Sequence, residues 1–287
     1  MIVDTHVHVF TDDRKNYPQL RDTARAGAIP SITEIGQTEW PLTTTENLIA
    51  MMDEAGVDKA TLVQAYFVYE YDNSYTIDSA LKYSNRFASV VVLDPMDKNA
   101  PDTLSQLVEK QGVTGIRFMR GRLPESSLGN PATFPLWERI QSLKLPLAVN
   151  DRVWEISKII PAMEKFPDVK VVFEHAWGHK VGAPPDYAVL APLFALAANP
   201  NVYIKTAINN IAAAREGGGS TPEQLYTRLV EVFGAKRIMW SSNYPAHPKF
   251  GGIKPRLEES KKAFAHLSAD DQAWILGKTA LHFYPSL

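Results

Sequence analysis

The chain opens with Ile2-Val3-Asp4-Thr5-His6-Val7-His8, an apolar run that carries two histidines one residue apart. Side chains alternate between the two faces of a strand, so His6 and His8 are expected to point the same way. At that spacing their rings can share a metal ion or a substrate anion. An isolated pair of this kind is equally compatible with two satisfied polar residues on a half-exposed strand. The rest of the chain has to decide between these interpretations.

This segment is the first of eight short runs rich in β-branched or aromatic residues, which we predict as strands. They span residues 2–8, 60–66, 87–93, 115–119, 146–150, 169–174, 202–206 and 237–241. The runs are continuously apolar, which is typical of a parallel sheet covered on both faces. No Gly-rich phosphate turn follows the first run, and eight β/α units close most economically into a barrel. The sequence therefore predicts a single (β/α)8 TIM barrel over residues 1–287.

Helical segments with recognisable ends lie between the predicted strands. Thr43 and Glu46 have the spacing of a capping box, and Gly56 is the predicted stop of the helix that follows. The later predicted helices are 101–111 ended by Gly112, 221–233 ended by Gly234, and a last helix capped by Ser268 and Asp271 that ends near Gly277.

Two connections are too long to be simple links, residues 11–43 after the first strand and residues 207–220 after the seventh. Loops that follow barrel strands build the face where barrel enzymes place their active sites, so we expect both at the catalytic mouth. The second connection contains three consecutive glycines. Residues 215–220 are therefore predicted to form either a mobile lid or a disordered segment.

The composition is that of an ordinary globular enzyme. The formal net charge of the 287 residues is −2, with acidic and basic residues mixed throughout, which argues against nucleic-acid and membrane-surface partners. The chain has no cysteine, so disulfides, thiolate nucleophiles and cysteine-based zinc sites are excluded. Because no signal-peptide pattern or transmembrane run is present, we expect a cytoplasmic enzyme. A homo-oligomer stays an open alternative.

Functional side chains of a barrel enzyme are expected at the carboxyl ends of the strands. In this chain those positions are unusually polar. Strand by strand, the residues there and just beyond are His6 and His8; Gln64, Tyr66, Tyr69, Asp72 and Asn73; Asp94; Arg117, Arg120 and Arg122; Asn150, Asp151 and Arg152; Glu174, His175, Trp177 and His179; Lys205 and Thr206; and Ser241, Ser242, Asn243, Tyr244 and His247.

Five motifs spread over nearly the whole chain carry a family resemblance. They are Asp4-Thr5-His6-Val7-His8, Val63-Gln64-Ala65, Gly115-Ile116-Arg117-Phe118, Glu174-His175 and Trp240-Ser241-Ser242-Asn243-Tyr244-Pro245. Together they resemble the amidohydrolase superfamily, in particular the amidohydrolase-related branch with 2-pyrone-4,6-dicarboxylate lactonase, sugar lactonases and nonoxidative decarboxylases of aromatic acids. The resemblance implies a metal site or carbonyl-polarising site built from His6, His8 and His175.

Two positions depart from the pattern of that family. Asn243 stands where members mostly have an aspartate that binds metal and exchanges a proton with the attacking water. Asn150 ends the fifth strand, where a histidine is usual. Three neutral histidines can still hold zinc with a water in the fourth position. Without a metal, the resemblance to the lactonases implies that the same rings polarise a carbonyl as hydrogen-bond donors.

The amide of Asn243 supplies neither an anionic ligand nor a titratable proton. We therefore favour metal-independent activity, with a weakly held divalent metal such as zinc as the alternative. Asn243 itself has three interpretations. It is a natural variant that orients substrate or water, or the base lies elsewhere with Asp151, Glu174 or His247 as candidates, or it is an engineered substitution that traps a ligand. For His247, a plain loop position is favoured over catalysis.

Arg117 is the best candidate for binding a substrate carboxylate, because a guanidinium pairs bidentately with a carboxylate and the family uses this position for substrate acids. Its alternative is a structural ion pair. Lys205, inside an apolar strand, is predicted as a buried counter-ion to Glu174 or Asp4. Further substrate-binding candidates are Gln64, Tyr66, Arg120, Trp177, Tyr244 and His247, whose aromatic members are equally compatible with ordinary packing.

The primary functional hypothesis is hydrolysis of a small cyclic ester, a lactone with one or more carboxylates, with water attacking from the side of Asn243. The first alternative keeps the fold and is a metal-dependent nonoxidative decarboxylase of an aromatic or unsaturated acid. The second alternative is a degenerate, non-catalytic binding protein, which the amide at position 243 and the missing strand-five ligand suggest.

Overall fold

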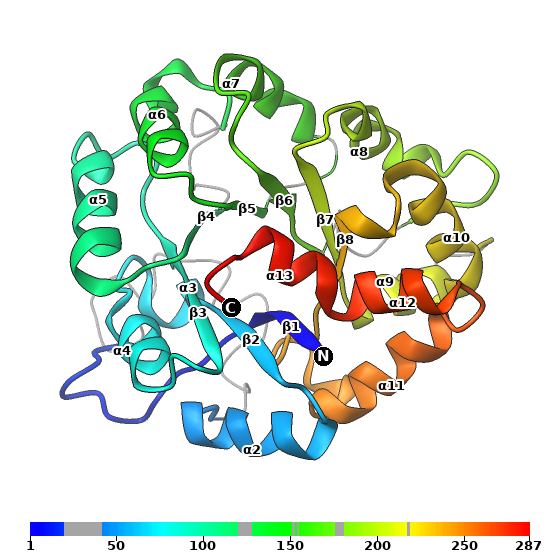
Figure 1. Ribbon diagram of the computed structural model, residues 1–287, viewed down its shortest axis with the longest axis horizontal. Helices are drawn as coiled ribbons and strands as arrows, with labels where there is room; N and C mark the ends of the chain where they lie inside the picture. The colour runs from blue at the N-terminus through cyan, green and yellow to red at the C-terminus, as the bar shows by residue number, and fades with distance from the viewer. Residues whose placement is uncertain (20–41, 120–127, 151–152, 154, 176–180, 217–218) are drawn as a thin grey trace.

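The computed structural model describes residues 1–19, 42–119, 128–150, 153, 155–175, 181–216 and 219–287. Eight strands form one parallel sheet in chain order and follow each other around a ring, with helices on the outside (Figure 1). They are β1 Val3–Val7, β2 Lys59–Val63, β3 Phe87–Val92, β4 Gly115–Met119, β5 Leu147–Asn150, β6 Val171–Phe173, β7 Val202–Thr206 and β8 Ile238–Trp240. The predicted (β/α)8 barrel is confirmed.

The ring is joined where the first strand meets the last. A parallel bridge links Val7 with Tyr244, and the His8 amide donates a hydrogen bond to the Tyr244 carbonyl at 2.9 Å. The Thr5 hydroxyl adds a hydrogen bond to the Trp240 carbonyl at 2.7 Å. The segment after β8 is therefore held directly against the histidine pair of β1.

The helices and their bounds are as follows. The α-helices are α2 Thr45–Ala55, α3 Tyr66–Tyr69, α4 Ser74–Lys82, α5 Ala100–Gln111, α6 Phe134–Ser142, α7 Ile160–Lys165, α8 Ala191–Ala195, α9 Ile208–Glu216, α10 Pro222–Phe233, α11 Ile253–Ala263, α12 Ala269–Ala273 and α13 Thr279–Phe283. Short 3-10 turns span Pro131–Thr133, Ile156–Ile159, Ala188–Leu190, Leu196–Ala198, Ala235–Arg237 and Pro248–Phe250, and a π-helical turn spans Trp274–Lys278.

Most predicted helix ends are confirmed, with two corrections. Helix α2 is capped by Thr44, one residue later than predicted, because the carbonyl of Thr43 accepts a hydrogen bond from the Phe10 amide and stays outside the helix. The last helix does not stop at Gly277. It continues through the π-helical turn into α13, and Gly277 is needed there because a Cβ would lie 2.4 Å from the Met1 carbonyl oxygen.

The prediction of a long loop over 207–220 is wrong for most of its length, because residues 208–216 form helix α9. The Ala207 amide donates a hydrogen bond to the Asn210 side chain at 2.9 Å at the start of this helix. Glycines 217 and 218 lie outside the described residues, as do residues 20–41 of the first long connection, so the predicted lid stays untested.

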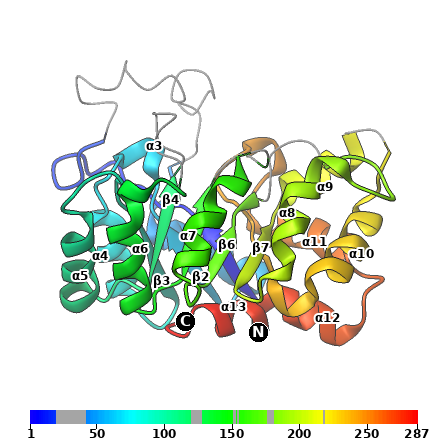
Figure 2. The same ribbon diagram turned by 90° about the horizontal axis from the view of Figure 1, so that it is seen from above.

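An apolar plug fills the amino-terminal end of the barrel. Side chains from the strands, among them Val3, Tyr203 and Met239, pack there against Phe283 and Tyr284 at the end of α13. Figure 2 shows α13 and both chain termini together at this end. The carboxyl ends of the strands are left to form the polar end of the barrel. No helix of the described segments is long and apolar enough to cross a bilayer.

Candidate active site

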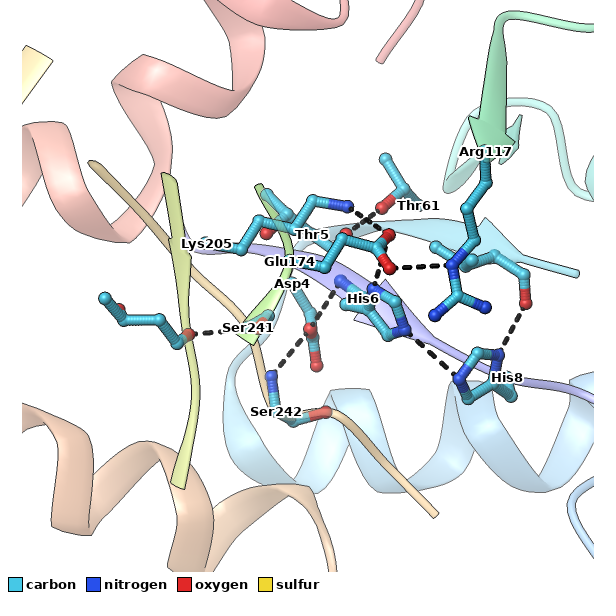
Figure 3. Close-up of polar contacts among 12 residues, drawn as sticks. Asp4, Thr5, His6, His8, Thr61, Arg117, Glu174, Lys205, Ser241 and Ser242 are labelled. Atoms are coloured by element: carbon cyan, nitrogen blue, oxygen red, sulfur yellow. Dashed lines mark hydrogen bonds and ion pairs between the residues drawn. The ribbon is translucent and has the colours of Figure 1, made fainter. Parts of the chain in front are cut away.

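Charged and imidazole side chains form a connected layer at the strands of the barrel (Figure 3). This layer borders the apolar plug where Lys205 approaches the Tyr284 ring. Asp4 and His6 of β1 and His8 just after it belong to this layer, and the other members come from β4, β7 and the end of β6. All of them are buried: Asp4, His6, His8, Arg117, Glu174 and Lys205. Charges at this depth persist only when they are paired or hydrogen-bonded, so their contacts define the site.

Glu174 is the hub of the layer. Its Oε2 accepts from Arg117 Nε at 2.6 Å, while its Oε1 lies 3.5 Å from Lys205 Nζ and 3.1 Å from His6 Nδ1. Burial opposes ionisation, but the neighbouring Arg117 guanidinium, His6 and Lys205 hold the pKa of Glu174 well below its usual range. Glu174 is therefore a fixed anion rather than a base, and the predicted role of Lys205 as its counter-ion is confirmed.

The pKa of Lys205 shows the effect of this burial. Burial lowers the pKa of its ammonium to about 8, with Glu174 opposing the shift and Arg117 adding to it. Its Nζ lies 5.7 Å from the centre of the Tyr284 ring, on the plug side of the layer. Lys205 is thus a structural cation held between Glu174 and the apolar plug.

The partners of the two β1 histidines fix their tautomers. His8 Nδ1 lies 2.7 Å from the Val63 carbonyl oxygen and must donate to it. His6 Nδ1 faces the Glu174 carboxylate at 3.1 Å, at an angle that departs from a linear hydrogen bond, and a proton there is needed to avoid repulsion. Burial holds the pKa of His6 well below its usual value and lowers that of His8 to about 4. Both rings are therefore neutral, with a single proton each.

The two Nε2 atoms then face one another with lone pairs, 3.1 Å apart. Two lone pairs at this distance repel unless a proton or a cation lies between them. Two nitrogens bound to one zinc at about 2.0–2.1 Å in tetrahedral geometry are about 3.3 Å apart, so the spacing is compatible with a shared proton and with a shared metal. The pair is the most reactive feature of the layer.

His175 completes the predicted set of three imidazoles. Its ring centre lies 4.3 Å from that of His6, and its buried Nδ1 has no hydrogen-bond partner in the described part of the chain. Burial lowers its pKa to about 3, so it is neutral too. Its backbone has a positive φ of 43°, and Asn210 of α9 donates to its carbonyl at 2.9 Å. Helix α9 thus holds this strained residue toward the pair.

A divalent metal fits these donors. Ligand atoms of His6, Glu174 and His175 lie within 4.8 Å of one another, and the facing Nε2 atoms of His6 and His8 form a ready pair of ligands. Glu174 on the far nitrogen of His6 is the kind of carboxylate that orients a metal-bound imidazole. The set lacks the anionic ligand that a carboxylate at position 243 would add.

Asp4 ties the layer to the segment after β8. Its Oδ1 accepts from the Ser242 amide at 2.9 Å and from the His6 amide at 3.2 Å, while its buried Oδ2 has no partner among the described residues. Burial raises the pKa of this carboxyl to about 6, which the hydrogen bonds from Ser242 and His6 and the Arg256 charge partly offset. Asp4 therefore anchors the backbone immediately before Asn243.

Asn243 is buried and has a left-handed backbone with φ of 55°. Its side chain makes no hydrogen bond with any residue that the structure describes, so its amide is available to water or substrate. Tyr244 is buried beside it, and its carbonyl accepts from the His8 amide. His247 is half-buried, also with a positive φ, 6.2 Å from the Phe250 ring. Position 243 thus lies on the segment that bonds directly to the histidine pair.

The other predicted pocket residues have mixed outcomes. Arg117 forms the structural ion pair that was its alternative interpretation, and its buried Nη1 has no hydrogen-bond partner in the described segments. Gln64 donates to the carbonyls of Glu70 and Asp72 at 3.1 and 2.8 Å, so it holds the turn after β2. Tyr66 packs 5.4 Å from the Tyr71 ring, as in ordinary aromatic packing.

Several candidates lie outside the described residues: Arg120, Arg122, Asp151, Arg152, Trp177 and His179. Two residues that position the site were missed by the sequence analysis. Arg256 and Asn210 lie in helices α11 and α9, where a polar residue is ordinarily taken for a solvent-facing one. Both side chains are fully buried, and this burial identifies them as parts of the site. No local sequence pattern predicts it.

Comparisons with known proteins agree with this geometry. The amidohydrolase family model matches residues 3–286. L-fucono-1,5-lactonase of Burkholderia ambifaria is 24% identical over 251 residues, 83% of this chain and 84% of that protein. A probable 2-pyrone-4,6-dicarboxylic acid hydrolase of Acinetobacter baumannii, solved with citric acid bound, is similar with a TM-score of 0.76 and 17% identity over 99% of both chains. A zinc-bound amidohydrolase of Burkholderia multivorans is similar with a TM-score of 0.74 and 16% identity over 99% of both chains. With its barrel, its three converging imidazoles and this match along nearly its full length, the chain belongs to the amidohydrolase family.

Proposed function

We propose that this protein hydrolyses a small cyclic ester, a lactone that bears at least one carboxylate. The observation that carries the proposal is the pair of facing imidazole lone pairs, 3.1 Å apart, next to an arginine whose Nη1 has no partner in the described part of the chain. The first is a built-in acceptor for the proton of an attacking water. The second is a permanent positive donor for a substrate anion. The similarity to L-fucono-1,5-lactonase supports a lactone as the substrate.

Each residue of the site has a separate role in the proposed reaction. Arg117 Nη1 binds the substrate carboxylate and fixes the ring, while the Asn243 amide orients the attacking water. The His6–His8 pair takes one proton from that water, shares it between the two Nε2 atoms, and becomes the positive charge beside the forming oxyanion. The same proton then passes to the ring oxygen as the acyl–oxygen bond breaks. One lactone and one water give one hydroxy acid, and the pair returns to its neutral state.

A divalent metal held by His6, His8 and His175 would supply Lewis acidity toward the carbonyl and lower the pKa of a bound water. We propose that hydrolysis proceeds without it. Position 243 offers an amide in place of an anionic ligand.

The test is a panel of sugar, pyrone and other carboxylated lactones, followed by acid release with and without a chelator. We expect acid release from at least one carboxylated lactone, unchanged by the chelator. His8→Gln should lower its rate by about 100-fold or more, the usual contribution of a general base. The matched control is His266→Gln, an exposed histidine that contacts Thr227 at 2.9 Å. A panel that stays blank beside an active family member would refute the proposal.

The same assay separates the two alternatives. Carbon dioxide released from an aromatic or unsaturated acid, together with stoichiometric zinc or manganese that is lost with activity on chelation, would identify the decarboxylase. Binding of a hydroxy acid without turnover, with hydrolysis appearing only in Asn243→Asp, would identify the binding protein.

A further inference from the structure

Arg256 is a fully buried charge whose partners are carbonyl oxygens. Its guanidinium donates five hydrogen bonds, and within the described segments no carboxylate lies at ion-pair distance from it. Nε binds the carbonyl of Gly251 at 2.9 Å, Nη1 binds those of Ser242, Asn243 and Ala246 at 3.1, 3.3 and 2.7 Å, and Nη2 binds that of His247 at 2.9 Å. All of these acceptors lie in the eleven residues after β8. Burying a guanidinium this way is unfavourable unless its donors are fully used.

The acceptors include the two strained residues of this segment. Asn243 and His247 both have positive φ angles, 55° and 56°, which residues other than glycine adopt only when the surroundings impose them. The carbonyls of both accept from Arg256. The planar fork of arginine offers five donors at fixed angles, which lysine cannot do. One side chain thus holds both left-handed turns at once.

A second anchor holds the same segment from the barrel side. Asp4 accepts from the Ser242 amide at 2.9 Å, while Arg256 takes the Ser242 carbonyl. The Arg256 guanidinium also lies 5.4 Å from the centre of the Tyr244 ring. The backbone around Asn243 is therefore fixed by the Asp4 carboxylate on the Ser242 amide and by the Arg256 guanidinium on the carbonyls of Ser242 and Asn243.

We propose that Arg256 is a positioning residue of the reaction: by binding the carbonyls of Asn243 and His247, it fixes the backbone that carries the Asn243 side chain, next to the Tyr244 carbonyl that accepts from the His8 amide. It touches no reacting atom and acts through the backbone. The inference rests on the proposed hydrolysis for its kinetic consequence, whereas its structural consequence does not depend on the substrate.

The test compares Arg256→Lys with Arg237→Lys. Arg237 is the matched control, because it also donates to backbone carbonyls, those of Phe233, Ala197 and Asn199 at 2.8, 2.8 and 3.0 Å, but at the opposite end of β8. Arg256→Lys should lower kcat by about 100-fold, the effect expected for a misplacement of about 1 Å at a reacting group. KM should change little, because the substrate carboxylate stays on Arg117. Arg237→Lys should leave both constants near those of the parent protein.

Hydrogen exchange supplies the readout that needs no substrate. Amides within 242–251 should exchange faster in Arg256→Lys and be unchanged in Arg237→Lys. If Arg256→Lys folds poorly, Arg256→Ala provides a second test. Adding millimolar guanidinium to Arg256→Ala should restore kcat and exchange protection, whereas methylammonium should restore neither. A normal kcat in folded Arg256→Lys overturns the proposal, and so does unchanged exchange. If the parent protein hydrolyses no lactone, the proposed function is refuted, but the proposed role of Arg256 is not. The hydrogen-exchange comparison then decides whether Arg256 fixes the segment after β8.

Discussion

Replacing Glu174 with glutamine tests the charge balance of the buried layer. The substitution keeps the volume of the side chain and removes its charge, so the Arg117 guanidinium and the Lys205 ammonium lose the anion that lies 2.6 and 3.5 Å from them. Removing one partner of a buried ion pair costs about 3–5 kcal/mol. Burial lowers the pKa of Lys205 from 10.5 to about 8 although Glu174 opposes the shift, so the ammonium would be less stable still without this anion.

The same substitution predicts a pH dependence whose sign is fixed. In the parent protein the folded-state pKa of Lys205 is lower than the unfolded value, so the unfolded state binds more protons and stability rises between about pH 8 and 10.5. Without Glu174 the pKa of Lys205 falls further, and the rise begins at a lower pH. The stability gap between Glu174→Gln and the parent protein should therefore be smaller at pH 9 than at pH 7.

The assay is urea unfolding of both proteins at pH 7 and pH 9. The control is Glu46→Gln, which removes an equally close but exposed ion pair to Lys82 at 2.8 Å and should cost about 1 kcal/mol or less. Adding Lys205→Met to Glu174→Gln should abolish the narrowing of the gap with pH. The reasoning is refuted if Glu174→Gln costs no more than Glu46→Gln, or if the gap is the same at both pH values.

Three further predictions concern single residues. Asn243→Asp should add an anionic ligand beside the histidines and tighten zinc binding at least tenfold in calorimetric titration; equal affinity in both proteins would mean that position 243 does not face the metal donors. In the parent protein the unfolding free energy should rise between about pH 4 and 6.5, because the folded-state pKa of His8 lies below its unfolded value. His8→Gln removes this titrating group, so the rise should be smaller by about 3 kcal/mol. Unfolding free energies from urea titrations that depend on pH equally in both proteins would contradict this. Gly129→Ala places a Cβ 1.7 Å from the Lys158 carbonyl oxygen and should cost several kcal/mol in thermal unfolding, roughly 3 or more, whereas Gly56→Ala, with open space around it, should cost about 1 kcal/mol despite its φ of 71°; similar losses would show that the close approach is relieved.

Much of the fold could be predicted because its signals are local. A continuously apolar run predicts a strand buried on both faces, and glycines such as Gly56 and Gly112 end helices because a left-handed residue is needed there. The failures are also local. The loop expected over 207–220 is mostly helix α9, because the run of Ile and Ala residues before the three glycines favours a helix over 208–216.

By itself, the sequence determined the barrel and the residues that its interior presents. Period-two alternation turns Asp4, His6 and His8 to one side of β1 whatever else the chain does. Only the tertiary structure decided what these side chains do. Glu174 meets Arg117 across a separation of 57 residues, and the proton positions of the imidazoles follow from that carboxylate and from the Val63 carbonyl. Such contacts depend on the register between strands and on burial, which no short segment of sequence encodes.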